Sequence, residues 1–488
     1  MKKLILVQPP LLGLLDGFSF GLISLANYIV LNNKNVEVDL LDFSRMSFSE
    51  VENRISEISN DVDGSNLSFI GITTTTATYQ AALFVAKTFK KFLPKSVIIF
   101  GGPHATADYG TILKYHRDIV DVIIIGEGEK SLNYLLQNYP KLELIPGIAY
   151  VRNNRIHKNF PPPLLTQEEL DSIPVVFKNK SIGTPGKFNH ITYVSSRGCF
   201  YKCSFCAVGN NKIRSKSIKA FIRDIESLLK LGFKRIAIED NFFVHSLQRA
   251  KDICKALIEL KKKRNFTWDC QTRVESLIHE DIVDLLEAAG CEAVYIGVES
   301  FNFDHLIYLN KTKNPEYYIK VLLEKVIPNL MDSKIECYLN LQFGLPNETT
   351  YHVENTISIL ESIGHMALNK GKFITIFPQL HVIYPGTPLF YQELKNGLFP
   401  EDIFEYFTKW EMDHQPVIAW LGEHFAHGAG GLPIGILDKK RLKDRVFDLQ
   451  TDKILAISYT LKKISRLPGI KVFNYGDYIV SELMGKGG

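Results

Sequence analysis

The chain has 488 residues, enough for two or three domains with separate cores. With 45% hydrophobic and 23% charged residues it has the composition of an ordinary soluble globular protein. A formal net charge of +4 spread over this length gives no reason to expect nucleic-acid binding. The sequence lacks an apolar run near the roughly 20 residues of a membrane span, so we expect a cytoplasmic protein without membrane contact.

Short apolar segments alternate with helical stretches over the first 150 residues. Strands are predicted over 3–8, 36–41, 68–73, 96–100 and 121–125, and helices over 20–33, 47–58, 77–93, 106–116 and 129–138. The strands do not alternate between apolar and polar residues, which is typical of strands buried on both faces. Residues 1–145 are therefore predicted to form a doubly wound α/β domain with a parallel sheet.

A different pattern follows over residues 146–189. A hairpin is expected around Asn153 and Asn154, and a polar stretch after Pro161-Pro162-Pro163 favours a linker that packs along the surface.

Longer strand–helix units resume over residues 190–390. Strands are predicted over 191–196, 234–239, 266–271, 293–298, 335–343 and 373–383, with helices over 217–231, 246–263, 279–289, 315–332 and 350–364. Six such units predict a partial (β/α)6 barrel, short of the usual eight. Residues 391–488 show weak periodicity and are interpreted as a mostly helical segment that covers the barrel mouth.

Three of the seven cysteines, Cys199, Cys203 and Cys206, fall within one short stretch. They follow a predicted strand and precede a helix, where α/β folds place active sites. Such a cluster favours a metal over disulfides in a reducing compartment. Three cysteines would leave one iron of a 4Fe–4S cluster open to chemistry, whereas a zinc site or an electron-transferring ferredoxin needs a fourth ligand. Each of the remaining cysteines, Cys254, Cys270, Cys291 and Cys337, is interpreted as a small core residue.

The cysteine spacing, with the aromatic Phe205 before the last cysteine, resembles the signature of the radical S-adenosylmethionine superfamily. The resemblance covers residues 190–390. It implies that the amino and carboxylate groups of S-adenosylmethionine chelate the open iron. Electron transfer then yields methionine and a 5′-deoxyadenosyl radical.

Further segments match positions at successive strand ends in that family. Glu239 and Asp240 stand where a Gly-Gly-Glu motif often holds the amino group, so which carboxylate binds it stays open. Arg273 is expected to pair with the methionine carboxylate. Glu299 and Ser300 end the next strand and are expected to face the same pocket. The turns at Gly344-Leu345-Pro346 and Tyr384-Pro385-Gly386-Thr387 are expected to close over the ligands.

The first domain resembles the cobalamin-binding domain found at the front of many radical S-adenosylmethionine enzymes, over about residues 1–140. The residues implied as cobalamin contacts follow successive strands: Gln8, Thr74, Thr75, Gly101, Gly102, Pro103, His104, Gly126, Glu127 and Gly128. Paired glycines let a backbone approach a ligand closely. The Asp-x-His-x-x-Gly motif that supplies a cobalt ligand elsewhere is absent. His104 is therefore expected to bond the corrin's side amides or to cap the following helix.

The leading interpretation is a cobalamin-dependent radical methyltransferase acting on an unactivated carbon. The resemblance implies that the 5′-deoxyadenosyl radical abstracts hydrogen and that methylcobalamin then delivers a methyl group. It further implies an electron donor such as flavodoxin or ferredoxin, and a small-molecule or peptide substrate. The alternatives are a cyclase, diol dehydratase or rearrangement enzyme without methyl transfer, and a non-catalytic cobalamin or iron–sulfur binding protein.

Methyl transfer would require both cofactors to face one cavity. We therefore expect the linker to fold back so that the loops of Gly102 and Cys203 oppose each other. Aromatic, histidine and glycine residues of the last segment are candidates for lining that cavity: Trp410, Trp420, His424, His427 and Gly428 to Gly431.

Overall fold

We describe a computed structural model of the protein over residues 2–10, 19–61, 67–76, 78–176, 190–209, 211–345, 348–381, 383–396, 460–461 and 463–473. The described residues fall into two compact units. The first contains the residues up to 176 together with 383–396, and the second contains 190–381 together with 460–473. The candidates Trp410, Trp420, His424, His427 and Gly428 to Gly431 lie outside the described residues.

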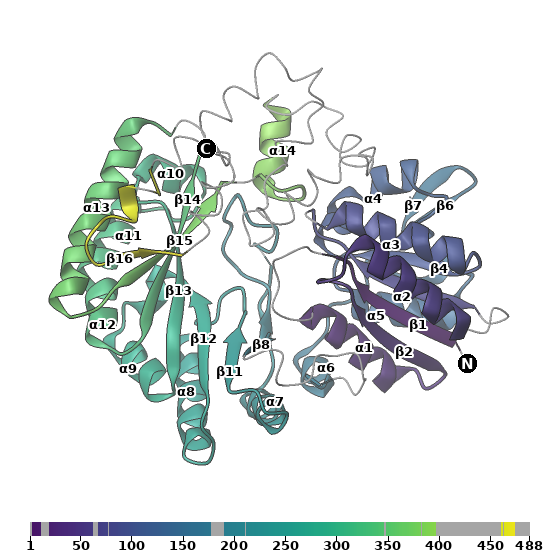
Figure 1. The fold of residues 1–488 in the computed structure, drawn as a ribbon, viewed down its shortest axis with the longest axis horizontal. Coiled ribbons are helices and arrows are strands. Elements are labelled where there is room, and N and C mark those ends of the chain that lie inside the picture. The colour runs from purple at the N-terminus through teal and green to yellow at the C-terminus, as the bar shows by residue number, and fades with distance from the viewer. Residues whose placement is uncertain are drawn as a thin grey trace. The chain divides into compact units, whose positions relative to one another are not determined.

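The first unit is built on a seven-stranded sheet with the order β2-β1-β3-β4-β5-β6-β7 (Figure 1). Its strands are β1 (Lys2–Gln8), β2 (Val36–Asp42), β3 (Ser68–Thr73), β4 (Val97–Gly101), β5 (Val122–Ile124), β6 (Ile148–Arg152) and β7 (Arg155–Lys158). Its helices are α1 (Phe20–Asn32), α2 (Phe48–Asp61), α3 (Tyr79–Phe92), α4 (Pro103–Tyr115), α5 (Gly128–Asn138), the 3₁₀ turn η1 (Leu142–Leu144), α6 (Gln167–Ser172) and α14 (Pro388–Lys395).

The doubly wound prediction is confirmed by the side chains of β1, which alternate between two cores. Leu4 and Leu6 join the core formed with α1 and α5, whereas Ile5 and Val7 join the core formed with α2, α3 and α4. The five strands β1 to β5 pair in parallel, and β1 lies between β2 and β3. The chain thus reverses its winding direction at β1 and β3, and ligands of open α/β sheets bind at such a switch point.

The segment 146–189, predicted as a surface linker, contributes β6, β7 and α6 to the first unit. The hairpin is closed by Asn153 and Asn154, which have φ of 51° and 59° as a type I′ turn requires. Helix α6 begins with a capping box between Thr166 and Glu169, and its Leu170 is buried in the core shared with α1 and α5.

The second unit is a seven-stranded parallel sheet with the order β16-β15-β14-β13-β12-β11-β8. Its strands are β8 (His190–Tyr193), β11 (Arg235–Ile238), β12 (Thr267–Thr272), β13 (Cys291–Glu299), β14 (Glu336–Phe343), β15 (Ile374–Leu380) and β16 (Ile470–Val472), and β9 (Ser196–Arg197) pairs with β10 (Arg214–Ser215) apart from them. Its helices are α7 (Ile218–Lys230), α8 (Leu247–Lys261), α9 (Glu280–Ala288), α10 (Phe303–Tyr308), α11 (Pro315–Val321), α12 (Ile327–Asp332) and α13 (Thr350–Asn369), with the 3₁₀ turn η2 (Val274–Leu277) and the π segment η3 (Leu322–Val326).

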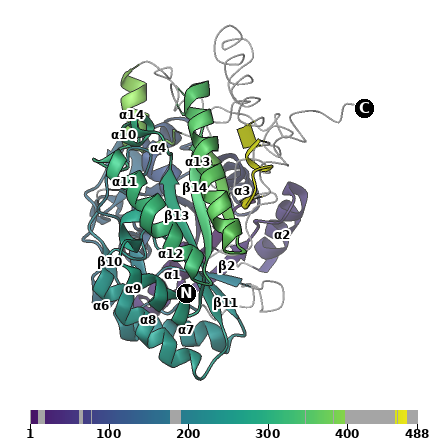
Figure 2. The same cartoon turned by 90° about the vertical axis from the view of Figure 1, so that its left-hand side faces the viewer.

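Among the described residues, the helices α8, α9, α12 and α13 cover one face of this sheet, as Figures 1 and 2 show. The strand positions facing them are fully buried, as Ile238, Cys270 and Val294 illustrate at one register level. The next level carries Gln271 and Tyr295 on the opposite, inner face, where both side chains are only partly buried. The six predicted strands are present in order, so the partial barrel is confirmed.

Two details differ from the sequence expectation. A seventh strand, β16, pairs with β15 from a segment that showed no strand pattern. The helix predicted over 315–332 is divided by η3, which ends just before Pro328. Proline cannot donate the backbone hydrogen bond that a continuous helix needs, so the chain widens into a π turn there. None of the helices in the described part of the chain is long and apolar enough to cross a bilayer.

Candidate functional site

The three clustered cysteines lie on one loop between β9 and β10. Gly198, at φ +92°, starts the loop, and a Cβ there would lie 2.6 Å from the carbonyl oxygen of Lys212. The loop closes on itself because the backbone N–H of Asn211 donates to the carbonyl of Cys199 and that of Cys206 donates to the carbonyl of Cys203. Cys203 is buried and the other two are half-buried.

The three thiols do not converge on one point. Their sulfur atoms are not all within 4.8 Å of one another, so they do not form the group that a single tetrahedral ion needs. A four-iron cluster instead binds each cysteine through a different iron. The donor set and its spread therefore fit a cluster and disfavour the zinc alternative. The four other cysteines are all buried, as predicted.

Asp240 holds the strand end that leads into this loop. Its carboxylate accepts backbone N–H bonds from Ser195 and Ser196 at 2.5 and 2.9 Å, and hydroxyl bonds from the same residues at 2.6 and 2.7 Å. The side chain is completely buried. All its acceptor positions are thus used within the protein, which disfavours Asp240 relative to Glu239 as the carboxylate for the cofactor's amino group; which of the two binds it stays a prediction.

We expect replacement of Asp240 by alanine to destabilise the second unit by about 3 kcal/mol or more, because two buried amides and two hydroxyls lose their acceptor. Urea denaturation measures this change. The control is Glu239→Gln, at the exposed neighbouring position, which should leave stability nearly unchanged. Full stability of the alanine variant together with weaker cofactor binding would instead restore Asp240 as a ligand.

Glu239 remains the carboxylate available at the end of β11. It is exposed, yet the surrounding protein still removes enough water to raise the pKa of its carboxyl, and the negative charge of Asp269 raises the pKa further. A hydrogen bond with Thr192 opposes both effects on the pKa.

Arg273 reaches the cysteine loop itself, and its expected pairing with a carboxylate of the cofactor stays a prediction. Its Nη1 donates to Sγ of Cys203 at 3.4 Å, and its Nε and Nη2 donate to both carboxylate oxygens of Glu275. Nη2 also donates to the carbonyl of Lys311 at 2.5 Å. The guanidinium is therefore committed to protein partners.

Glu299 sits in a strained backbone conformation at the end of β13. Its φ of +71° is unusual for a residue with a side chain and costs about 1–3 kcal/mol. Lys311 donates to one carboxylate oxygen at 3.0 Å and Gln342 donates to the other at 2.7 Å. Gln342 in turn bonds His381 at 2.6 Å. A buried polar chain thus fixes the Glu299 carboxylate in place.

Ser300 and Phe205 complete the expected contacts in the second unit. The Ser300 hydroxyl accepts the backbone N–H of Asn302 and lies 3.4 Å from Nδ1 of His305, so its bonds support the start of α10. Phe205 is half-buried in the cysteine loop.

In the first unit, Thr74 ties β3 to β4 and α4. Its hydroxyl donates to the carbonyl of Gly101 at 2.8 Å and accepts the backbone N–H of Ala105 at 3.1 Å. The residue is completely buried and its hydroxyl is bonded within the protein, so its expected contact with cobalamin stays a prediction. The exposed Thr75 exchanges hydrogen bonds with Thr78 at the start of α3.

The glycines at this sheet edge divide into two kinds. A Cβ on Gly102 would lie 2.6 Å from the carbonyl oxygen of Thr74, and one on Gly128 would lie 3.0 Å from Leu25. The absence of a side chain at these two glycines therefore serves packing, and their expected backbone contact with a ligand stays a prediction. No described atom lies within 4 Å of a Cβ built on Gly101 or Gly126, so both face open space at the carboxyl-end edge of the sheet.

His104 is enclosed by protein, with 1% of its surface exposed. Its Nδ1 lies 3.2 Å from the Thr76 hydroxyl, and its ring packs 4.5 Å from that of Tyr79. Burial lowers the pKa of the imidazole to about 3. This enclosure disfavours a direct contact with a ligand, and the expectation that His104 bonds a corrin or caps α4 stays a prediction.

The remaining residues of the first unit that were expected to contact cobalamin lie at the same edge of the sheet. Gln8 ends β1 and is buried, and Pro103 is exposed at the first position of α4. Glu127 precedes α5 as its N-cap residue. The turn at Gly386, expected to close over the ligands of the barrel, belongs to this unit, where a Cβ built on Gly386 would lie 2.9 Å from Cβ of Ala107 in α4.

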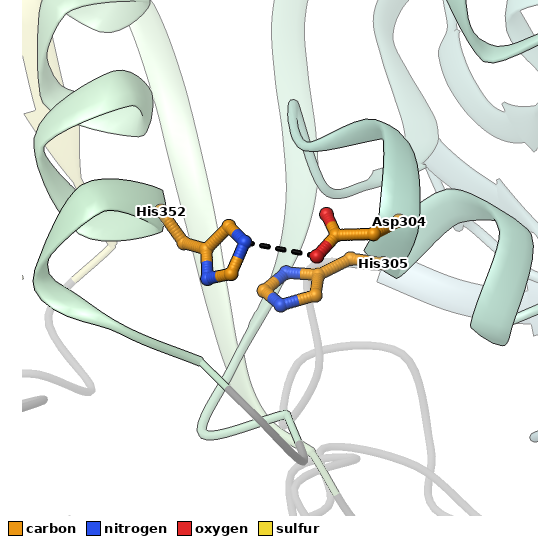
Figure 3. Close-up of side chains that lie close together, drawn as sticks. All are labelled: Asp304, His305 and His352. Atoms are coloured by element: carbon orange, nitrogen blue, oxygen red, sulfur yellow. Dashed lines mark ion pairs between the residues drawn. The ribbon is translucent and has the colours of Figure 1, made fainter.

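Sequence reasoning missed one group of potential metal ligands, where α10 and α13 begin. Ligand atoms of Asp304, His305 and His352 lie within 4.8 Å of one another (Figure 3). Nδ1 of His352 accepts the backbone N–H of Thr349, so the neutral ring carries its proton on Nε2, which lies 2.9 Å from Asp304. The positive ends of two helices also disfavour a cation. We interpret the group as a helix cap.

Two family models match the chain. Residues 193–358 match the radical SAM superfamily, and residues 15–136 match the B12 binding domain. These matches cover the cysteine loop with its neighbouring strand ends and the open edge of the first sheet.

Similar proteins cover most of the chain. An uncharacterized methyltransferase of Pyrococcus horikoshii is 26% identical over 421 residues, 82% of this chain and 84% of the relative. An anaerobic magnesium-protoporphyrin IX monomethyl ester cyclase of Synechocystis is 25% identical over 60% of each chain. The fold is shared with the radical S-adenosylmethionine methyltransferase TsrM of Kitasatospora setae, solved with cobalamin and a 4Fe–4S cluster, at TM-score 0.66, 16% identity, and 81% and 75% coverage.

The cofactors of these two domain families are a 4Fe–4S cluster with S-adenosylmethionine, and cobalamin. The three spread thiols and the open glycines at the carboxyl-end edge of the first sheet are compatible with both. The chain therefore carries a domain of the radical S-adenosylmethionine superfamily over residues 193–358 and, in front of it, a B12 binding domain over residues 15–136.

Proposed function

We propose that the protein is a cobalamin-dependent methyltransferase that acts on an unactivated carbon of a small molecule. The observation that carries the proposal is the presence, in one chain, of the three-cysteine loop and a cobalamin-binding domain. The methyltransferase relative, which aligns over 82% of this chain across both units, supports it. The bound cofactors would supply the radical and the methyl group, and the protein positions them and excludes water.

Cys199, Cys203 and Cys206 are proposed to hold the cluster and to leave one iron free for the amino and carboxylate groups of S-adenosylmethionine. Glu239 is the candidate acceptor for that amino group, because Asp240 is fully used within the protein. Glu299, fixed by Lys311 and Gln342, is a second candidate contact. Low-potential electrons would come from a donor such as flavodoxin or ferredoxin.

Gly101 and Gly126 are proposed to face cobalamin, since both lie at the carboxyl-end edge of the first sheet and open onto free space. Histidine ligation of cobalt through His104 is not part of the proposal, because that ring is enclosed. The expected common cavity for both cofactors stays a prediction.

A radical cyclisation without methyl transfer is the second candidate, and the cyclase relative from Synechocystis favours it. The same cysteine loop and radical would serve that reaction. The two candidates therefore differ in the fate of the methyl group and not in how the radical is generated.

The deciding experiment uses the full chain, reconstituted anaerobically with iron, sulfide and cobalamin. It is incubated with S-adenosylmethionine labelled in the methyl group and with candidate small molecules. We expect 5′-deoxyadenosine together with label in the product, and loss of label transfer when cobalamin is omitted. A product that retains its carbon count while 5′-deoxyadenosine forms would contradict methyl transfer and support the cyclase.

A further inference from the structure

The guanidinium of Arg273 is buried against the cysteine loop. Its Nη1 lies 3.4 Å from Sγ of Cys203, a normal length for a donor to sulfur, and both residues are buried. A charged N–H donor in a buried position interacts more strongly than a neutral donor in water would. The contact therefore places a positive charge against one presumed cluster ligand.

Three further contacts fix the guanidinium in this position. Glu275 holds two of its nitrogens, the carbonyl of Lys311 accepts a third bond, and the ring of Tyr201 lies 3.6 Å from its central carbon. Tyr201 belongs to the cysteine loop itself, between Cys199 and Cys203. Arg273 is thus held by Glu275 and Lys311, which lie outside the loop, and by Tyr201 within it.

The Lys311 carbonyl comes from a segment that also supports the loop directly. The backbone N–H of Ser204 donates to the carbonyl of Leu309 at 2.9 Å, and its hydroxyl donates to the carbonyl of Tyr308 at 3.0 Å. The Asn310 side chain donates to the carbonyl of Lys202 at 2.6 Å. Movement of Arg273 relative to Cys203 is therefore opposed by the bonds of Arg273 and by the bonds of the two chain neighbours of Cys203, Lys202 and Ser204.

We propose that Arg273 is a positioning residue that raises the reduction potential of the cluster through its charged hydrogen bond to Cys203. One electron from a reductant such as dithionite makes the cluster and its thiolates more negative. A cationic donor to a ligand sulfur stabilises that reduced state more than the oxidised one, and hydrogen bonds to sulfur are among the factors that set such potentials. No bond is made or broken in this step.

The inference rests on Cys203 as a cluster ligand and does not depend on methyl transfer. Its test is a dithionite titration of the reconstituted full chain, in which the reduced cluster is followed by electron paramagnetic resonance. In Arg273→Met, which keeps an unbranched apolar stem but loses the charge and donors, we expect the ratio of reduced to oxidised cluster at a fixed potential to fall about tenfold. This corresponds to about 59 mV for a one-electron couple.

Glu275→Gln is the matched variant with the opposite expected sign, because it removes the charge that neutralises Arg273. The potential should rise while iron content stays unchanged, and Arg273→Lys should fall between the wild type and Arg273→Met. If Arg273→Met retains too little iron for titration, the expected rise of the reduction potential in Glu275→Gln still tests the proposal. An unchanged potential in Glu275→Gln, or in iron-replete Arg273→Met, would overturn the proposal.

Discussion

Replacing Cys199, Cys203 and Cys206 together by alanine is expected to remove the cluster completely. The reconstituted wild type should contain about four irons and four sulfides per chain, and the triple variant almost none. The thiolates are the only strong iron donors that the described loop presents, so no partial site should remain. Production of 5′-deoxyadenosine should fall to background, because no cluster delivers the electron. Iron and sulfide assays, with the visible absorption spectrum, measure the result.

The control for this variant is Cys254→Ala. Cys254 is a buried residue of α8 that packs in the helical layer of the second unit. Removing its sulfur should cost about 1 kcal/mol of stability and leave iron content unchanged. A triple variant that retains its iron, or a Cys254 variant that loses it, would contradict the assignment of the cluster to the loop.

The element order could be read from the sequence because each buried strand is a short apolar run bounded by polar loops. The strands of the first sheet matched their expected positions to within a residue or so, and β1 lies between two cores as double winding requires. Strand β16 could not be predicted. Its three residues have no pattern of their own and become a strand only by pairing with β15.

The cysteine loop could also be predicted, since it depends on spacing within one short segment. The roles of residues whose hydrogen-bond partners are distant in the sequence could not be predicted. Asp240 and Thr74 stand at strand ends where ligands bind, and only the structure shows that neighbouring backbone groups occupy them. Arg273 was assigned to a cofactor carboxylate because the sequence does not reveal Glu275 and Cys203 as its partners.

A similar ambiguity affects paired glycines, because the sequence does not tell in which direction a side chain would point. Gly101 ends β4, and its neighbour Gly102 precedes α4. A Cβ on the first would enter open space, and a Cβ on the second would collide with the backbone of Thr74. This difference distinguishes Gly101, which is proposed to leave space for cobalamin, from Gly102, which lets its backbone pack against Thr74.

Gly101→Trp is accordingly expected to abolish cobalamin binding without unfolding the protein. The indole would occupy the open space at the carboxyl-end edge of the first sheet, where the corrin is proposed to lie. We expect affinity for cobalamin to fall at least about 100-fold, equivalent to about 2.7 kcal/mol, while the melting temperature of the apoprotein stays within a few degrees. Spectroscopic titration with hydroxocobalamin and thermal unfolding measure the two quantities.

Gly102→Ala is the matched control, and it should show the reverse pattern. Its φ of +98° and the 2.6 Å approach to the Thr74 carbonyl make even a methyl group strained, with a cost of about 1–3 kcal/mol. The melting temperature should therefore fall, while any folded protein keeps its affinity for cobalamin. Unchanged cobalamin affinity in Gly101→Trp would show that the corrin does not lie against this edge, since an indole there leaves no space beside the Gly101 backbone.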